Sequence, residues 1–184
     1  MRSHPTRPVR RVVRSALLSG AVLAVLAASG CARSEPGVVA YVGDRSISQQ
    51  RLDDAVTGAT EALDGQPVSS QAIATVLIHG ELSDQLAAKH QIALSDAARD
   101  ALIKGSNLAP LLNVPKALPL AYDIADEQIV AKQLGEAYLT EIAAIPVKLN
   151  PRFGVLDPAD QTVKSDQTGS LAKALPTPEP APTP

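Results

Sequence analysis

Residues 38–63 change from one hydrophobic period to another, and this change locates the start of a folded domain. Residues 38–42 are small or β-favouring and end at Gly43-Asp44, a pair that can form a tight hairpin turn. Ser48 is well placed to cap a helix. Apolar residues then recur at helical spacing: Leu52, Ala55, Val56, Ala59 and Leu63. The pattern therefore predicts a strand, a turn, a short strand and a helix.

A longer helix is predicted from Ser69 or Ser70 to about His90. Its apolar residues fall on two adjoining faces, so we expect it to be central and packed on both sides. Gly80 lies in its middle, where glycine costs about 1 kcal/mol relative to alanine, and a close helix crossing would explain it. A short helix over residues 97–104 is expected to follow an N-cap at Ser95-Asp96.

The second half of the chain is also largely helical in pattern. Residues 106–121 hold three prolines amid leucines and are expected to be irregular but apolar. Asp123 is a candidate cap for a last long helix ending at Pro146, along which one apolar stripe runs through Ala131, Leu134, Tyr138, Ile142 and Ile145. With only 2% aromatic residues, the composition favours packed helices over a large β-sandwich. We expect a mostly α fold, with about four helices closed by a short two- or three-stranded β element.

The N-terminal residues 1–30 have the parts of a secretory signal peptide. A basic stretch precedes an apolar run from Ala16 to Ala28, which at about 13 residues is too short to span a bilayer as a helix. The boundary Ala28-Ser29-Gly30-Cys31 resembles a bacterial lipobox, which implies that Cys31 is lipidated. Cys31 is the only cysteine, so it cannot form an internal disulfide, and the alternative to lipidation is a free thiol. Arg10-Arg11 leaves twin-arginine export open beside general secretion.

These features divide the chain into four parts. After the signal peptide we expect a lipidated tether over 31–37, a folded domain over 38–156 and a disordered proline-rich tail over 157–184. The tether reaches at most about 25 Å, so the domain would lie beside the membrane, lipid-anchored at its extracytoplasmic face. The formal net charge is −2, and every charged residue before Cys31 is an arginine. The remainder is therefore more acidic still, which excludes nucleic acid as an expected partner.

Two motifs carry a family resemblance. Val42-Gly43-Asp44 followed by Ile47-Ser48 and a helix resembles the opening of the SurA/PrsA-type chaperone N-terminal domain, as in short actinobacterial lipoproteins. Residues 150–154, Asn-Pro-Arg-Phe-Gly, resemble the closing strand of the same proteins. The resemblance covers about residues 38–156. It implies that the closing strand pairs beside the opening hairpin and brings Phe153 near Tyr41.

The resemblance also implies a function. A domain of this kind would be a holdase that binds unfolded or translocating polypeptides without catalysis. An envelope assembly or adaptor lipoprotein that binds one folded partner is the alternative. Larger relatives insert a parvulin-type isomerase domain before the closing strand, and there is no room for one here, so we do not expect an enzyme. The pattern indicates neither the client nor the oligomeric state.

The sequence gives little support for a metal site, a cofactor site or a catalytic carboxylate pair. His79 and His90 lie about three helical turns apart, roughly 16 Å along the axis, so they cannot bind one metal ion, and no cofactor is expected. The acidic pairs Asp53-Asp54 and Asp123…Asp126 are interpreted as solvated helix faces.

We call residues 108–120 the leucine segment and consider it the candidate wall of a client-binding groove. The alternative is a loop that covers the core. The candidate residues are Leu108, Leu111, Leu112, Leu118 and Leu120.

Overall fold

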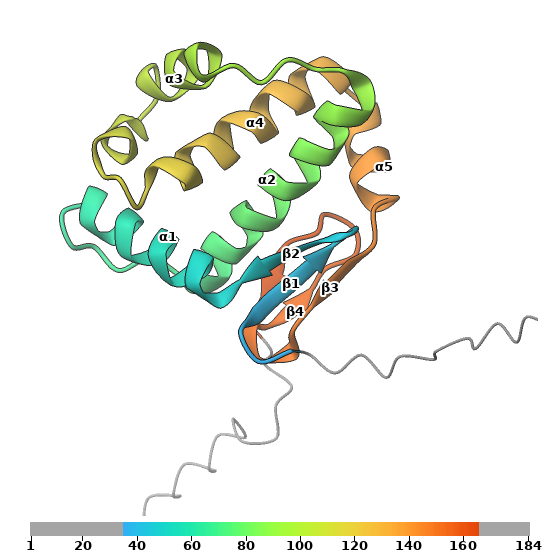
Figure 1. Cartoon of the computed structure of the whole chain (residues 1–184), viewed down its shortest axis with the longest axis horizontal. Helices are drawn as coiled ribbons and strands as arrows, with labels where there is room; N and C mark the ends of the chain where they lie inside the picture. The colour runs from blue at the N-terminus through green and yellow to red at the C-terminus, as the bar shows by residue number, and fades with distance from the viewer. Residues whose placement is uncertain (1–34, 166–184) are drawn as a thin grey trace, which may run out of the picture. The chain divides into compact units, whose positions relative to one another are not determined.

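The structure is a computed structural model, and it describes residues 35–165. The expected fold class is confirmed: helices dominate, and a small antiparallel sheet accompanies them (Figure 1). Over the described residues the elements are β1 (Val38–Val42), β2 (Arg45–Ser48), α1 (Gln49–Ala62), α2 (Ser70–His90), α3 (Asp96–Lys104), the 3-10 helix η1 (Ala109–Asn113), α4 (Leu118–Leu134), α5 (Ala137–Ala143), β3 (Val147–Leu149), the 3-10 helix η2 (Pro151–Phe153), β4 (Val155–Leu156) and β5 (Val163–Lys164).

Strand β1 lies in the middle of a three-stranded antiparallel sheet of order β2-β1-β3. The predicted hairpin joins β1 to β2, and Gly43 has the positive φ of 59° that such a turn requires. The β1–β2 register shifts between Val38 and Ala40, and both Val39 and Ala40 are buried. Strict alternation would have placed one of these neighbours on the outer face, so the bulge adds a residue to the core side of the sheet.

The end of the domain returns to its beginning, as the resemblance implied. Strand β3 pairs with β1, with Lys148 opposite Tyr41. The Asn150 backbone N–H donates to the Val39 carbonyl at 2.8 Å, and its side-chain amide donates to the Val38 carbonyl at 3.0 Å. The strand itself covers only residues 147–149, so the placement of the closing strand at residues 150–154 is wrong. Asn150 caps the 3-10 helix η2 and turns the chain away from the sheet.

Helix α2 is the central element that its two apolar faces predicted. It lies between α4 on one side and the sheet on the other, while α1 packs beside both helices and α3 packs on α4 (Figure 1). The Ser69 hydroxyl accepts from the Ala72 N–H and caps its first turn, as expected. Gly80 allows the close crossing with α4, because a Cβ there would lie 2.5 Å from the Cβ of Asp123.

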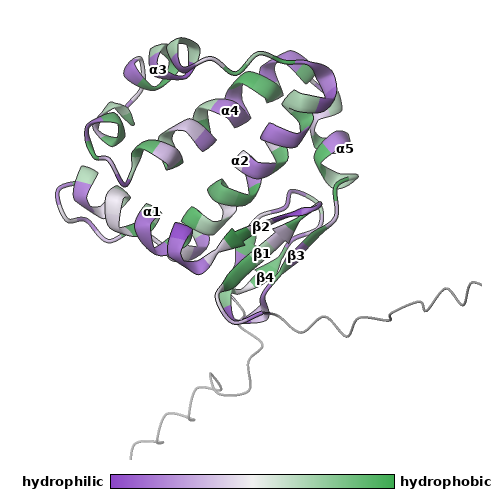
Figure 2. Cartoon of the chain, in the orientation of Figure 1, coloured by the Kyte–Doolittle hydropathy of each residue, from purple (hydrophilic) through white to green (hydrophobic). Residues whose placement is uncertain are grey.

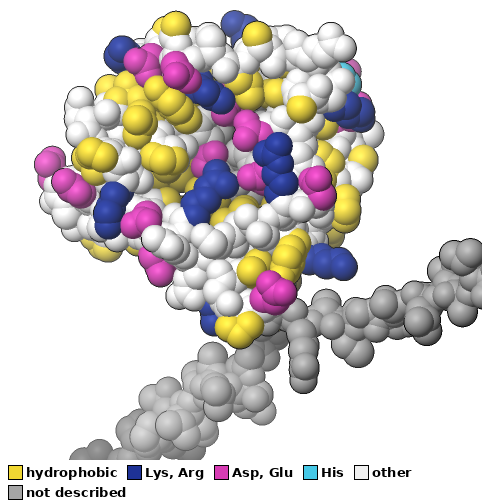
Figure 3. All heavy atoms as spheres, viewed as in Figure 1, with side chains coloured by type: hydrophobic (Ala, Val, Ile, Leu, Met, Phe, Trp, Pro, Cys, Tyr) yellow, Lys and Arg dark blue, Asp and Glu magenta, His cyan; other side chains and the backbone are white. Residues whose placement is uncertain are grey.

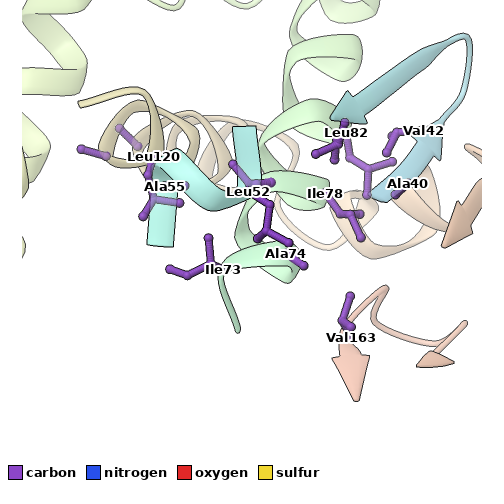
Figure 4. Packing of buried hydrophobic residues seen from close by; sticks show 14 of the residues in the cluster. Ala40, Val42, Leu52, Ala55, Ile73, Ala74, Ile78, Leu82, Leu120 and Val163 are labelled. Atoms are coloured by element: carbon purple, nitrogen blue, oxygen red, sulfur yellow. The ribbon is translucent and has the colours of Figure 1, made fainter. Parts of the chain in front are cut away.

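The core is one cluster of aliphatic side chains contributed by every layer. Figure 2 shows hydrophobic residues along the inner faces of α2, α4 and β1. In the close view of Figure 4, Leu52 from α1, Ile78 and Leu82 from α2, and Val42 from β1 lie around the same interior. Branched aliphatic side chains fill this space, which agrees with the low aromatic content of the chain.

The expected single last helix is wrong in two ways. Helix α4 begins at Leu118, with Pro119 in its first turn, so Asp123 is inside the helix and is not its cap. The helix ends at Gly135, whose φ of 56° breaks the path, and α5 then begins at Ala137. The apolar pattern in the sequence suggested one helix because Tyr138 and Ile142 of α5 pack in the same core as the apolar residues of α4.

The expected boundary at Asp157 is also wrong for the residues that the structure describes. Strands β4 and β5 form a second antiparallel pair, which we call the C-terminal hairpin, residues 155–164. Val163 is buried, and its backbone N–H donates to the hydroxyl of Thr75 on α2 at 2.8 Å. A two-residue strand with one buried side chain is too short to give a periodic pattern, so the sequence did not reveal it. Residues 166–184 of the predicted tail lie outside the described residues.

Candidate functional site

The leucine segment lies between α1, α3 and the start of α4 and divides into buried and partly exposed residues. Leu111 and Leu120 are 3% and 2% exposed, so they belong to the core and cannot contact a client in this structure. Leu108, Leu112 and Leu118 are partly exposed. The prediction that these leucines line a groove is therefore wrong for Leu111 and Leu120. Client binding stays a prediction for the other three.

Close packing against α1 holds the leucine segment in place. A Cβ at Gly58 of α1 would lie 2.5 Å from the backbone of Lys116 and Ala117, so glycine allows the loop to touch the helix directly. The Lys116 ammonium lies 3.0 Å from a carboxylate oxygen of Asp54. These contacts fix the connection between η1 and α4, near which the three partly exposed leucines lie.

A set of ion pairs joins the helices on the face that Figure 3 shows, where acidic and basic side chains lie next to one another between apolar ones. The Nη2 of Arg51, on α1, donates to both carboxylate oxygens of Asp123 at 2.9 Å. Its Nη1 donates to Glu81 at 3.3 Å, and Arg45 of β2 donates to the other oxygen of Glu81 at 2.7 Å. One guanidinium therefore links α1 to α2 and α4 at their crossing.

A second pair lies further along α4. Arg99 of α3 donates to both oxygens of Asp126, at 2.7 and 2.8 Å. The same guanidinium carbon lies 5.2 Å from the ring centroid of Tyr122, whose hydroxyl donates to Asp100. Helix α3 is thus attached to α4 by a bidentate pair and a cation–π contact.

The interpretation of Asp123 and Asp126 as a solvated face is wrong. They are 7% and 3% exposed and face arginines across the helix interface. A signal for this was present in the sequence. Glu81 and Asp84 on α2, like Asp123 and Asp126 on α4, stand three residues apart in helices that also carry many apolar residues, and an acid on the buried side of such a helix needs a partner. We call Arg45, Arg51, Glu81, Asp84, Arg99, Asp123 and Asp126 the charged cluster.

Electrostatics in the charged cluster reflect burial and an excess of acids. Burial raises the pKa of Asp123, Arg51 opposes this effect, and the nearby carboxylates Asp84 and Asp126 add to it, so that the pKa is about 7. Burial also raises the pKa of Asp84, whose nearest cation is Arg45 at 3.8 Å. Four carboxylates here face three guanidinium groups. The arrangement fixes helices relative to one another, at a cost in desolvation.

The two histidines of α2 have separate partners. The Nδ1 of His79 lies 2.8 Å from Glu127, and its Nε2 lies 2.9 Å from the carbonyl oxygen of Asp160. His90 approaches Glu141 at 3.5 Å near the end of the helix. Within residues 35–165 no group of three metal-ligating side chains comes together.

The expected membrane attachment falls on residues the structure does not describe. Cys31, the candidate lipidation site, lies outside residues 35–165. Among those residues, no helix has both the length and the apolarity needed to cross a bilayer.

Comparisons with protein-family models, with curated proteins and with solved structures find no match to this chain.

Proposed function

We propose that this chain is a lipid-anchored extracytoplasmic protein whose domain binds unfolded or translocating polypeptides without catalysis. The observation that carries the proposal is the closure of the domain. Strand β3 returns beside β1 after the helices, which is the arrangement that the chaperone resemblance implies. Residues 144–146 alone separate α5 from β3, so the chain passes from its last helix to the closing strand without an inserted isomerase domain.

The partly exposed leucines supply the apolar contacts that a holdase needs. Leu108 precedes η1, Leu112 lies in η1 and Leu118 begins α4, and Leu108 and Leu112 pack against the core. Exposed apolar surface in a fixed position can contact the apolar side chains of extended polypeptides of many sequences. Holding a client in this way needs no group that lowers the isomerisation barrier of about 18–20 kcal/mol.

One observation favours the adaptor alternative. With Leu111 and Leu120 in the core, the leucine segment presents less apolar surface than five exposed leucines would. A smaller surface, fixed by the Lys116–Asp54 ion pair and the contact at Gly58, suits one folded partner better than a broad range of clients.

The test is an aggregation assay with an unfolded client and the chain from residue 32 onward. We expect protection at stoichiometric excess and no acceleration of prolyl isomerisation. Combined Leu108→Ser, Leu112→Ser and Leu118→Ser substitutions should reduce protection while far-ultraviolet circular dichroism shows unchanged helicity. Leu139→Ser is the matched control, because Leu139 is 59% exposed on α5, outside the leucine segment.

The outcomes separate the two candidates. Loss of protection in the triple variant alone supports binding by the leucine segment. If the unmodified chain protects no client, while crosslinking in envelope membranes yields one stoichiometric partner, the adaptor takes the place of the holdase.

A further inference from the structure

The C-terminal hairpin is attached to the helical core at a small number of points. The Val163 side chain points toward Ala74 and Ile78 of α2 in Figure 4, and its N–H donates to Thr75. One turn further along α2, His79 reaches the carbonyl oxygen of Asp160 in the turn between β4 and β5. The polar part of this attachment therefore depends on Thr75 and His79.

Both ring nitrogens of His79 face hydrogen-bond acceptors. Nδ1 is 2.8 Å from a carboxylate oxygen of Glu127, and Nε2 is 2.9 Å from the Asp160 carbonyl oxygen. A neutral imidazole carries one N–H, so either tautomer would point a lone pair at one of these oxygens. Only the imidazolium donates to both. In the neutral ring, the Glu127 carboxylate favours the tautomer with its proton on Nδ1, because a charge-assisted hydrogen bond is stronger than one to a carbonyl. That tautomer turns the Nε2 lone pair toward the Asp160 carbonyl oxygen and so weakens the contact with the hairpin.

The surroundings of His79 favour the cation. Burial alone lowers its pKa, but hydrogen bonds to Glu127 and to the Asp160 carbonyl outweigh burial and raise the pKa above the ordinary 6.5. The Asp160 carboxylate, which accepts from Thr162, also raises the pKa of His79. Three further titratable groups on the neighbouring elements are paired or neutral. Asp157 pairs with Lys164 within the hairpin, Asp123 on α4 pairs with Arg51, and Tyr138 on α5 contacts Ser83 and stays neutral because burial raises its pKa to about 12.

The hairpin itself contains two unfavourable features. Gln161, in its turn, adopts a left-handed conformation with φ of 58°, which a residue with a side chain rarely takes. The buried side-chain oxygen of Gln161 has no hydrogen-bond partner among the described residues. The turn is otherwise well hydrogen-bonded, since the Thr162 N–H and hydroxyl both donate to the Asp160 carboxylate and Lys164 pairs with Asp157. These bonds lie within the hairpin, so they hold its shape, while its position on the domain depends on its contacts with α2.

We propose that protonated His79 acts as a latch that fixes the C-terminal hairpin to α2 and α4, and that its deprotonation lets the hairpin detach while the rest of the domain stays folded. The direction follows from the raised pKa. The stabilisation is fully present below about 6.5 and is lost as pH rises through the pKa of the folded state. Detachment would uncover Val163 and the surface of α2 around Thr75. The latch does not depend on the proposed function.

Hydrogen exchange measured by mass spectrometry on the mature chain tests the latch. Protection of peptides within residues 155–165 is followed from pH 5.5 to pH 8, after correction for the intrinsic pH dependence of exchange. We expect protection of the hairpin to fall by about tenfold or more over this range, the effect of losing a charge-assisted hydrogen bond. Peptides from β1 and β3 serve as the internal reference and should change less.

Variants assign the effect to His79. His79→Gln should lower hairpin protection at pH 5.5 by about tenfold and remove most of its pH dependence. Glu127→Gln removes the carboxylate that favours the imidazolium, so the midpoint should move to lower pH while the transition remains. His90→Gln is the matched control, because His90 lies on the same helix and makes no contact with the hairpin among those described. It should behave as the unmodified chain.

Several results would overturn the latch. The latch is refuted if protection of the hairpin does not change with pH. It is also refuted if the His79→Gln variant has the pH profile of the unmodified chain. Equal loss of protection in the hairpin and in β1 would mean that the whole domain opens, and Asp123 would then be the better explanation. If His79→Gln does not fold, the Glu127→Gln variant is the test: a midpoint shifted to lower pH supports the latch, and an unchanged or higher midpoint refutes it.

Discussion

Replacing Arg51 with methionine should destabilise the domain strongly. Arg51 donates to both oxygens of Asp123 and to Glu81, and those carboxylates are buried. Methionine keeps much of the apolar stem but removes the cation, so two buried carboxylates lose a partner. Breaking a buried pair in this way costs about 3–5 kcal/mol. Because the Arg51 side chain is itself 34% exposed, water reduces the loss to the lower end, about 3 kcal/mol.

The cost of Arg51→Met should depend on pH in a defined direction. The folded-state pKa of Asp123, about 7, already lies above its ordinary value of 3.8. Removal of Arg51 raises it further, so the folded variant takes up a proton that the unfolded chain does not hold. At pH 5 the carboxyl group is largely neutral and the loss is small, while at pH 8 the full cost appears. The difference in unfolding free energy from the unmodified chain should therefore grow as pH rises.

Urea denaturation followed by circular dichroism at pH 5 and pH 8 measures this difference, since the chain contains no tryptophan for fluorescence. Arg152→Met is the matched control. Arg152 is exposed and contacts Gln49 and the ring of Phe153, so its loss should stay within about 0.5 kcal/mol. The double variant Arg51→Met with Asp123→Asn should recover part of the stability at pH 8. Equal losses at both pH values, or a loss no larger than that of Arg152→Met, would refute the reasoning.

Three further predictions concern packing, the hairpin and the membrane. Gly80→Ala should destabilise by about 1–3 kcal/mol in urea denaturation despite the better helix propensity of alanine, because the added Cβ meets Asp123 at 2.5 Å, and a gain in stability would show that the helices can separate freely. Truncation after Leu156 removes the buried Val163 and should cost about 1.5–3 kcal/mol, whereas truncation after Ser165 should change the melting temperature little, and equal melting temperatures would contradict the packing of the hairpin. Cys31→Ala should release the protein from membranes in cell fractionation, and sedimentation with membranes after a high-salt wash would disprove attachment through this residue.

The sequence was sufficient for elements whose cause is local. Ser48, Ser69 and Ser95 cap their helices as expected, and Gly43 turns the hairpin, because each depends on a few neighbouring residues. The pairing of β3 with β1 joins residues more than a hundred positions apart, and only the family resemblance suggested it.

The errors come from residues whose role depends on distant partners. Asp123 stands near the start of a helical pattern, where a cap and a buried acid have the same local signature. Only the approach of Arg51 from α1 and the absence of a Cβ at Gly80 distinguish the two, and both follow from the tertiary fold. The leucine segment was similarly ambiguous. Apolar residues around prolines suit a groove or a core equally, and burial divides Leu111 and Leu120 from the others.

His79 and Asp123 shift stability in the same direction but over different parts of the molecule. Both pKa values are raised, so both groups favour the folded state at lower pH. Asp123 loses this contribution as pH rises from 3.8 to about 7, and His79 loses its own as pH rises above 6.5 through its pKa in the folded state. Asp123 lies at the crossing of α2 and α4, where its ionisation affects the contact between the two central helices. His79 contacts the edge of the core and a hairpin with one buried apolar side chain, that of Val163. A mildly alkaline pH should therefore open the hairpin first, since its attachment is the weaker of the two, and only greater destabilisation should separate the helices.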